Sequence, residues 1–124
     1  MEQLILHLIG DYVTQSDWMA VNKTKRFLPA WTHACFYATP FIFLCRDNWA
    51  FWTILVTHFF IDRYRLARYV VWAKNWIGPG NRPWSECTAT GYPPGRPDWL
   101  CVWLLIIADN TMHLAINYGA IKWL

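Results

Sequence analysis

Residues 98–121 read DWLCVWLLIIADNTMHLAINYGAI, and this stretch decides the expected fold. Asp98 is a suitable N-cap residue, and no proline interrupts the residues that follow it. Apolar side chains occupy nearly every face of such a helix, a pattern typical of a helix surrounded by an apolar environment. The stretch is also within the range of about 17–25 residues that a membrane-spanning helix needs.

Three similar apolar stretches precede it, at about residues 4–20, 29–45 and 49–72. Polar turns separate them, and residues 78–97 hold so many Gly and Pro residues that we expect no regular structure there. The sequence therefore predicts one all-α domain over residues 1–124, a four-helix transmembrane bundle whose helices cover about 4–20, 29–45, 49–72 and 98–121.

Composition and charge agree with a membrane protein. Charged residues make up 15% of the chain and it holds 10 Trp, whereas soluble domains carry about 25% charged residues. Such an apolar chain is not disordered, and a net charge of +3 without a basic stripe makes nucleic acid an unlikely partner. The basic residues gather after the first and third stretches, which predicts basic loops in the cytoplasm and both termini outside. The first residues lack the basic start of a signal peptide, so we expect no cleavage.

Polar residues interrupt the apolar stretches at helical spacing. His7, Asp11 and Gln15 are four residues apart in the first stretch, and His58 and Asp62 repeat this spacing in the third. The fourth stretch carries Asp109, His113 and Asn117 at the same spacing, and His33 lies in the second. Residues four apart share one helix face, so each set is expected to face the inside of the bundle. Hydrogen-bonded His–Asp pairs that tie the helices together are one explanation, because buried charges must be neutralised.

Metal binding is the other explanation, and the number of candidate ligands favours it. Imidazole and carboxylate together suit transition metals such as Zn or Mn. The candidates are too many for one tetrahedral ion but suit two ions about 3.5–4 Å apart. The predicted ligands are His7, Asp11, His33, His58, Asp62, Asp109 and His113, with Gln15 and Asn117 as hydrogen-bond partners around them. The four cysteines show no CxxC pair and are expected only to pack.

The opening of the chain resembles a known but uncharacterised family of small bacterial and phage membrane proteins. Residues 7–23 carry its HLxxDxxxQxxxMAxxK pattern, and His33, residues 58–69 and Asp109 with His113 also follow the family in order and spacing. The pattern is more loosely similar to inner-membrane putative metal-dependent hydrolases and to helical zinc phospholipases. The resemblance implies a multi-pass protein of the bacterial inner (cytoplasmic) membrane and adds weight to a hydrolase.

The leading prediction is a membrane-embedded, metal-dependent hydrolase of a phosphoester, with a lipid headgroup, an isoprenoid phosphate or another amphiphilic phosphate as its substrate. Asp62 and Asp11 would be catalytic at a dinuclear centre, and Arg65 or Arg63 would hold the phosphate. Anchoring at the membrane interface is the other explanation for these arginines and for Arg68. A non-enzymatic metal-binding membrane protein, either a transporter or a phage-encoded modulator of a host protein, is the first alternative. A soluble helical phosphohydrolase resembling the HD superfamily is the second alternative. The sequence leaves the oligomeric state open, and a homo-oligomer is compatible with it.

Overall fold

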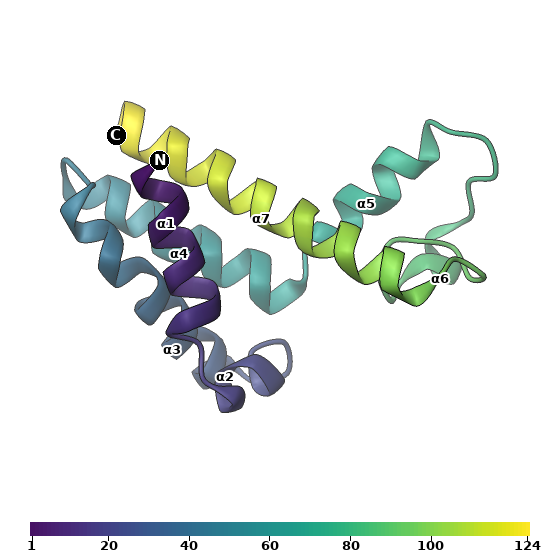
Figure 1. Ribbon diagram of the computed structural model, residues 1–124, viewed down its shortest axis with the longest axis horizontal. Helices are drawn as coiled ribbons and strands as arrows, with labels where there is room; N and C mark the ends of the chain where they lie inside the picture. Colours follow the sequence, from purple (N-terminus) through teal and green to yellow (C-terminus); the bar gives the residue numbers. More distant parts are fainter. The chain divides into compact units, whose positions relative to one another are not determined.

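The bend at residues 14–16 divides the first apolar stretch. In the computed structural model, which describes residues 1–124, α1 (Glu2–Leu8) continues into a π-helical segment, η1 (Ile9–Val13) (Figure 1). Ser16 then caps α2 (Asp17–Asn22), because its hydroxyl accepts a hydrogen bond from the Met19 backbone N–H at 3.4 Å. The single helix expected over about 4–20 is therefore three short elements.

The second and third stretches also form shorter α-helices than expected. Helix α3 (Phe27–Ala38) tightens into a 3-10 segment, η2 (Thr39–Phe43), at Pro40, which has no backbone N–H to continue the α-helical pattern. Asp47 caps α4 (Asn48–Tyr64) by accepting hydrogen bonds from the N–H groups of Trp49 and Ala50. Arg65 ends α4 in the left-handed conformation, with φ of 53°, and α5 (Ala67–Trp76) begins after it.

The segment expected to lack regular structure contains a short helix. Helix α6 (Trp84–Cys87) lies within residues 78–97, and Tyr69 of α5 stacks on Trp84 with ring centroids 4.4 Å apart. Arg68 of α5 donates a hydrogen bond to the Thr88 carbonyl oxygen at 2.8 Å. These contacts give the Gly- and Pro-rich segment a defined path against α5.

The chain divides into two compact units. One contains Met1–Arg65 together with His113–Leu124, and the other contains Leu66–Met112. Helix α7 (Asp98–Trp123) contributes its first part to the second unit and its last part to the first. All four cysteines are free.

The first unit has its core between α3 and α4. Ala30, Ala34 and Ala38 are fully buried at four-residue spacing on α3, and Ile54 and Leu55 of α4 are buried as well. Small side chains at this spacing allow two helices to approach closely, and a large side chain such as Phe41 then fills the remaining space.

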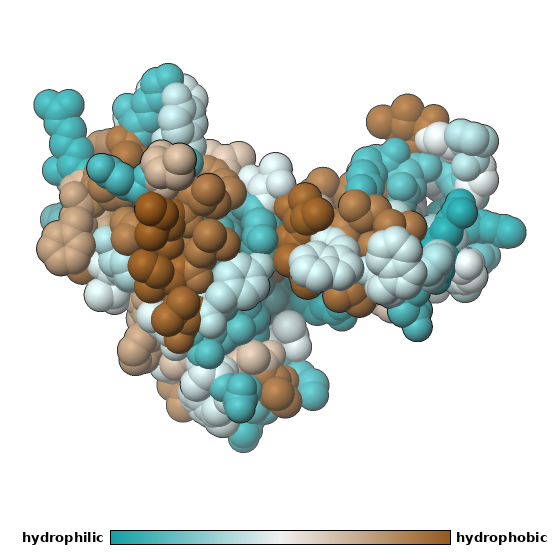
Figure 2. All heavy atoms as spheres, in the orientation of Figure 1, coloured by the Kyte–Doolittle hydropathy of each residue, from teal (hydrophilic) through white to brown (hydrophobic).

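Polar side chains are buried in this unit, while many apolar ones are exposed. His7, His33, His58 and His113 are each at most 1% exposed. On the outer face of α1, by contrast, Ile5 is 50% exposed. Figure 2 shows hydrophobic side chains gathered on the surface over α1 and over α7. The histidines therefore form an interior polar cluster rather than a solvated face.

The four-helix transmembrane bundle and the multi-pass location in the inner membrane are both wrong. The structure has seven α-helices, and only Asp98–Trp123 is long and apolar enough to cross a membrane. One physical reason is length, because a spanning helix needs about 20 residues and the stretches break at Ser16, Pro40 and Arg65. Helix α4 reaches 17 residues, but it carries the polar residues His58, Asp62 and Arg63.

Candidate metal centre

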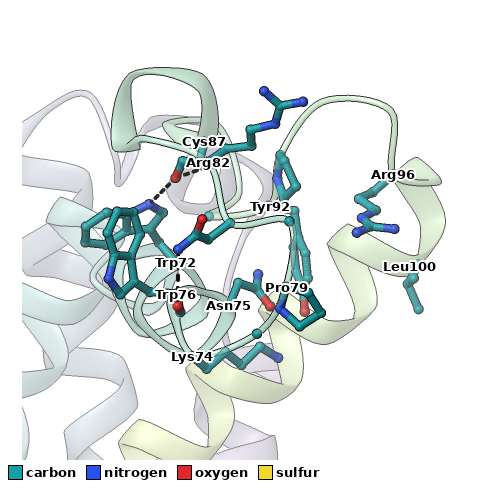
Figure 3. A pocket seen from close by; sticks show the side chains of 15 residues that line it. Trp72, Lys74, Asn75, Trp76, Pro79, Arg82, Cys87, Tyr92, Arg96 and Leu100 are labelled. Carbon is teal, nitrogen blue, oxygen red and sulfur yellow. Dashed lines mark hydrogen bonds between the residues drawn. The ribbon is translucent and has the colours of Figure 1, made fainter.

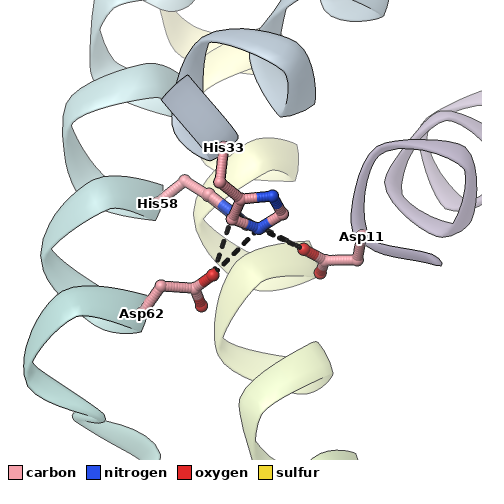
Figure 4. Close-up of side chains that lie close together, drawn as sticks. All are labelled: Asp11, His33, His58 and Asp62. Carbon is pink, nitrogen blue, oxygen red and sulfur yellow. Dashed lines mark hydrogen bonds and ion pairs between the residues drawn. The ribbon is translucent and has the colours of Figure 1, made fainter. Parts of the chain in front are cut away.

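Four buried side chains from three elements converge inside the first unit. Asp11 comes from η1, His33 from α3, and His58 and Asp62 from successive turns of α4 (Figure 4). The two histidines are at most 1% exposed and the two aspartates are 7% exposed. One ligand atom from each lies within 4.8 Å of all the others, so the set could hold a metal ion.

The separations of these atoms resemble the edges of a coordination tetrahedron. His33 Nε2 lies 3.2 Å from Asp11 Oδ1 and 3.0 Å from Asp62 Oδ2. His58 Nε2 lies 3.5 Å from Asp11 Oδ1 and 3.3 Å from Asp62 Oδ2. The two Nε2 atoms are 3.0 Å apart. Zn²⁺ bonds of about 2.0–2.2 Å to nitrogen and oxygen give tetrahedral edges of about 3.3–3.6 Å. The observed distances lie at or slightly below that range.

A close approach between helices brings Asp11 to this position. A Cβ atom on the preceding Gly10 would lie 2.7 Å from Tyr37 Cδ2 and 3.1 Å from Tyr37 Cα. Only glycine therefore lets η1 pack this tightly on α3, which carries His33. The π-helical turn is marked by the Thr14 N–H bonded to the Ile9 carbonyl oxygen at 2.9 Å, and such turns occur frequently at functional sites.

The two carboxylates are held in their ionised form by the surrounding imidazoles. Burial alone would raise the pKa of Asp62, but His58, His113 and His33 outweigh it and hold that pKa well below 3.8. Burial likewise opposes ionisation of Asp11, yet the hydrogen-bonding position of His33 and the charge of His58 lower its pKa below 3.8. The site therefore concentrates negative charge in a nearly dry interior.

The two imidazoles respond differently to the same surroundings. Burial lowers the pKa of His58 to about 4, and the nearby Asp62 offsets this only in part. His58 is therefore neutral near pH 7, which is the form that binds metals. Burial also opposes protonation of His33, but its contacts with Asp11 and Asp62 raise its pKa above 6.5.

Asp11 Oδ1 has no well-oriented hydrogen bond. The atom is buried and lies 3.2 Å from His33 Nε2, but no donor points at it with acceptable geometry. An unsatisfied buried polar atom costs about 1–3 kcal/mol, and more when it is charged. A cation at the centre of the four ligand atoms would remove that cost.

Lys23 provides part of the charge balance. Its Nζ donates a hydrogen bond to Asp62 Oδ2 at 2.6 Å and lies 3.3 Å from His33 Nε2. Its side chain is 19% exposed, so this ammonium group lies where the centre meets the surface. Lys23 therefore supplies one positive charge for two carboxylates.

His58 and Asp62 are in direct contact, and His113 connects them a second time because it contacts both. His113 Nε2 lies 3.2 Å from Asp62 Oδ1, and His113 Nδ1 lies 3.2 Å from His58 Nδ1. The ionised Asp62 only accepts hydrogen bonds, so His113 Nε2 donates to it. In a neutral His113 ring, Nδ1 then accepts from His58 Nδ1, which leaves the lone pair of His58 Nε2 facing the centre.

Tyr37 holds the other side of the His58 ring. The two rings stack with centroids 3.5 Å apart and an interplanar angle of 11°. Asn117 donates a hydrogen bond to the Tyr37 hydroxyl oxygen at 2.6 Å, and His7 Nδ1 lies 2.8 Å from the same hydroxyl. His7 Nδ1 is also 3.5 Å from Asp11 Oδ2. His7 and Asn117 thus contact the centre through Tyr37 and Asp11.

The remaining predicted residues are not among the four converging side chains. Gln15 is in the bend after η1 rather than on a helix face, and its Oε1 is buried without a hydrogen bond. Asp109 lies one turn before His113 on α7, in the second unit. Arg65 is exposed at the end of α4. Arg63 donates to the carbonyl oxygens of Thr24 and Lys25, so it ties α4 to the turn that follows α2.

Sequence reasoning missed Lys23 and Tyr37 as members of the site. Lys23 lies in the basic connection after the first apolar stretch, and it is also the last residue of the opening pattern that contains His7 and Asp11. Tyr37 lies four residues after His33 and so shares its helix face. A buried tyrosine hydroxyl needs a hydrogen-bond partner, which is the signal that could have placed it beside polar residues.

The arrangement can bind a divalent cation and keep a positive charge beside it. Two carboxylates neutralise a divalent ion, and the Lys23 ammonium adds one charge at the exposed side of the site. Such a centre attracts anions and can polarise a bound water molecule.

Comparison with known proteins yields one match. A family model described as "Protein of unknown function (DUF3307)" matches residues 1–78, which include the four converging residues. No curated protein and no solved structure matches the chain.

Proposed function

The chain belongs to the DUF3307 family of proteins of unknown function, and we propose that it is a metal-dependent hydrolase that acts on a phosphoester. The observation that carries the proposal is the tetrahedral spacing of Asp11 Oδ1, His33 Nε2, His58 Nε2 and Asp62 Oδ2. The resemblance of the sequence pattern to bacterial and phage proteins, and more loosely to metal-dependent hydrolases, supports the proposal.

The proposed ion is Zn²⁺, at one ion per centre. Two imidazole nitrogens and two carboxylate oxygens suit a borderline metal, and the short separations favour tetrahedral coordination. A dinuclear centre would need ligands for a second ion, and Asp62 Oδ1 and His113 Nε2, which lie 3.2 Å apart, could be two of them. We favour one ion because His113 already serves to fix the His58 ring.

Charge favours an anionic substrate. Asp11 and Asp62 neutralise the divalent ion, so the Lys23 ammonium is left to pair with a phosphoryl oxygen. In the proposed reaction, a water oxygen bonds to phosphorus while the ester oxygen leaves. The water's proton passes to Asp62, the carboxylate nearest Lys23, and then to the leaving oxygen.

A structural metal site is the second candidate. Four protein ligands saturate a tetrahedral ion, whereas catalytic zinc sites keep one position open for water. Under this alternative Asp62 would stay a ligand. Under the hydrolase proposal Asp62 would instead take the proton of the water, and a coordination position would be open for that water. The Lys23 ammonium has three N–H donors, so it could pair with a phosphoryl oxygen while keeping its 2.6 Å hydrogen bond to Asp62 Oδ2.

The test is turnover of bis-p-nitrophenyl phosphate and of a long-chain alkyl p-nitrophenyl phosphate by the zinc-loaded protein. We expect hydrolysis of at least one ester, its loss on chelation, and a drop of about 100-fold or more in Asp62→Asn. The Cys35→Ala variant, whose side chain is outside the centre, should keep full activity. A protein that binds zinc stoichiometrically and is stabilised by it, yet hydrolyses neither ester, would support the structural alternative instead.

A further inference from the structure

The second unit contains a pocket that is separate from the metal centre. Its volume is about 300 Å³, and it lies between α5 and the segment that leads to α7 (Figure 3). All of its lining residues fall between Trp72 and Leu100. Pockets that bind small organic ligands begin at about this size.

Positive charge lines this pocket without a balancing acid. Lys74, Arg82 and Arg96 are among the lining residues, and no Asp or Glu is. Lys74 Nζ lies 5.4 Å from the centre of the Tyr92 ring, so its ammonium group is next to the pocket wall. A pocket lined by cations alone favours an anionic ligand.

Two polar groups in the pocket have no partner. Asn75 Nδ2 and the Tyr92 hydroxyl are buried, and neither forms a hydrogen bond. Both residues line the pocket, and Figure 3 shows them close to Pro79. Buried donors that lack a partner are uncommon in native proteins, so a ligand with acceptor atoms at this place explains them.

Aromatic rings form another wall. Trp72 and Trp76 lie with ring centroids 5.4 Å apart. The Trp72 Nε1–H donates to the Arg82 carbonyl oxygen at 3.0 Å, which fixes the indole ring. Fixed indole and phenol rings offer surfaces on which a flat ligand ring can stack.

The position of Tyr92 is determined by its neighbour Gly91. Gly91 has φ of +84°, and a Cβ atom there would lie 2.2 Å from the Arg68 carbonyl oxygen and 2.8 Å from Val71 Cβ. Only glycine lets the segment pack on α5 in this way. The Tyr92 side chain is therefore placed in the pocket before any ligand binds.

We propose that this pocket binds a small organic phosphate that carries a flat ring, of the size and chemistry of a nucleoside monophosphate. Lys74 and Arg96 pair with the phosphate, Trp72 and Trp76 contact the ring, and Asn75 and Tyr92 donate to acceptor atoms of the ligand. The site is independent of the metal centre, because the two share no residue.

Isothermal titration with AMP, adenosine and inorganic phosphate tests the proposal on the full chain. AMP should bind, and adenosine or phosphate alone should bind at least about tenfold more weakly, since each lacks one set of contacts. AMP affinity should be the same with and without Zn²⁺. Lys74→Gln should weaken AMP binding about tenfold, and Tyr92→Phe about fivefold, since they remove a charged and a neutral hydrogen bond.

Stability measurements distinguish ligand contacts from structural roles. Tyr92→Phe removes an unsatisfied buried hydroxyl, so the ligand-free variant should unfold at the same or a higher temperature than the parent. Tyr118→Phe and Lys122→Gln, which pair with each other outside the pocket, are the matched controls and should bind AMP like the parent. The proposal fails if the parent does not bind AMP at millimolar concentration, if phosphate alone binds as tightly, or if Lys74→Gln and Tyr92→Phe bind AMP unchanged.

Discussion

Asp11 and Asp62 place two ionised carboxylates within a nearly dry interior, an arrangement that costs free energy unless cations compensate it. Lys23 supplies one positive charge, and the raised pKa of His33 shows that the site also favours a proton there. A divalent cation would replace both compensations, because it contacts all four ligand atoms at once. The residues of the centre could therefore hold a metal ion, and under the proposed function that ion stabilises the folded protein.

His58→Ala and Asp62→Ala should each lower zinc affinity by at least about 100-fold. Loss of a partner that only orients a ligand already costs about 10–100-fold, and loss of a ligand costs more. Zinc titration against a competing chelator measures the effect. Cys35→Ala and Cys101→Ala are the controls, because both thiols lie outside the four-residue set. Zinc loss in the cysteine variants with retention in His58→Ala would reverse the assignment.

Lys23→Gln should have the opposite effect on metal binding. The ammonium group lies 2.6 Å from Asp62 Oδ2 and so competes with a cation for that oxygen. The variant should bind zinc at least as tightly as the parent, while its metal-free form should lose stability because a buried carboxylate lacks its partner. Zinc titration and thermal unfolding with and without zinc measure both effects. Weaker zinc binding in Lys23→Gln would show that Lys23 supports the metal site rather than competing with it.

At the scale of the helices, the contact between η1 and α3 positions the centre. Gly10→Ala would place a Cβ atom 3.1 Å from Tyr37 Cα and 3.2 Å from its carbonyl oxygen, and backbone atoms cannot move aside cheaply. We expect a loss of about 1–3 kcal/mol in the free energy of unfolding, typical of overpacking, together with weaker zinc binding. Chemical denaturation and zinc titration measure the two effects.

Gly119→Ala is the matched control for this substitution. The added Cβ would meet only Trp123 side-chain atoms at 3.4 and 3.5 Å, an ordinary contact within α7. Alanine is favoured over glycine in a helix by about 1 kcal/mol, so this variant should be slightly more stable than the parent. Equal behaviour of the two alanine variants would mean that the close approach at Gly10 is unimportant.

Helical spacing located the polar cluster but not the ends of the elements. The four-residue spacing of His58 and Asp62 placed both on one face of a helix, and the structure brings them to within 3.3 Å. The breaks depend on single residues whose effect is local, the Ser16 cap and the left-handed Arg65. Apolar periodicity continues across these residues, so hydropathy alone joined separate helices into apparent membrane spans.

For the molecule as a whole, contacts between residues distant in sequence were the least predictable part. Lys23 meets Asp62 across 39 positions and Asn117 meets Tyr37 across 80. Neither pair has a spacing signal, because tertiary packing alone brings them together. The family match covers residues 1–78 and so contains the four converging residues, whereas His113, Asn117 and most of the second unit lie beyond it.

Metal content of the purified protein is the most direct test of the central claim. Elemental analysis of protein purified without chelator, with protein concentration from amino-acid analysis, should find about one zinc per chain. Removing that ion should lower the unfolding temperature, and adding zinc back should restore it. Protein that contains no transition metal, and whose unfolding temperature does not change with added Zn²⁺ or Mn²⁺, would contradict the account.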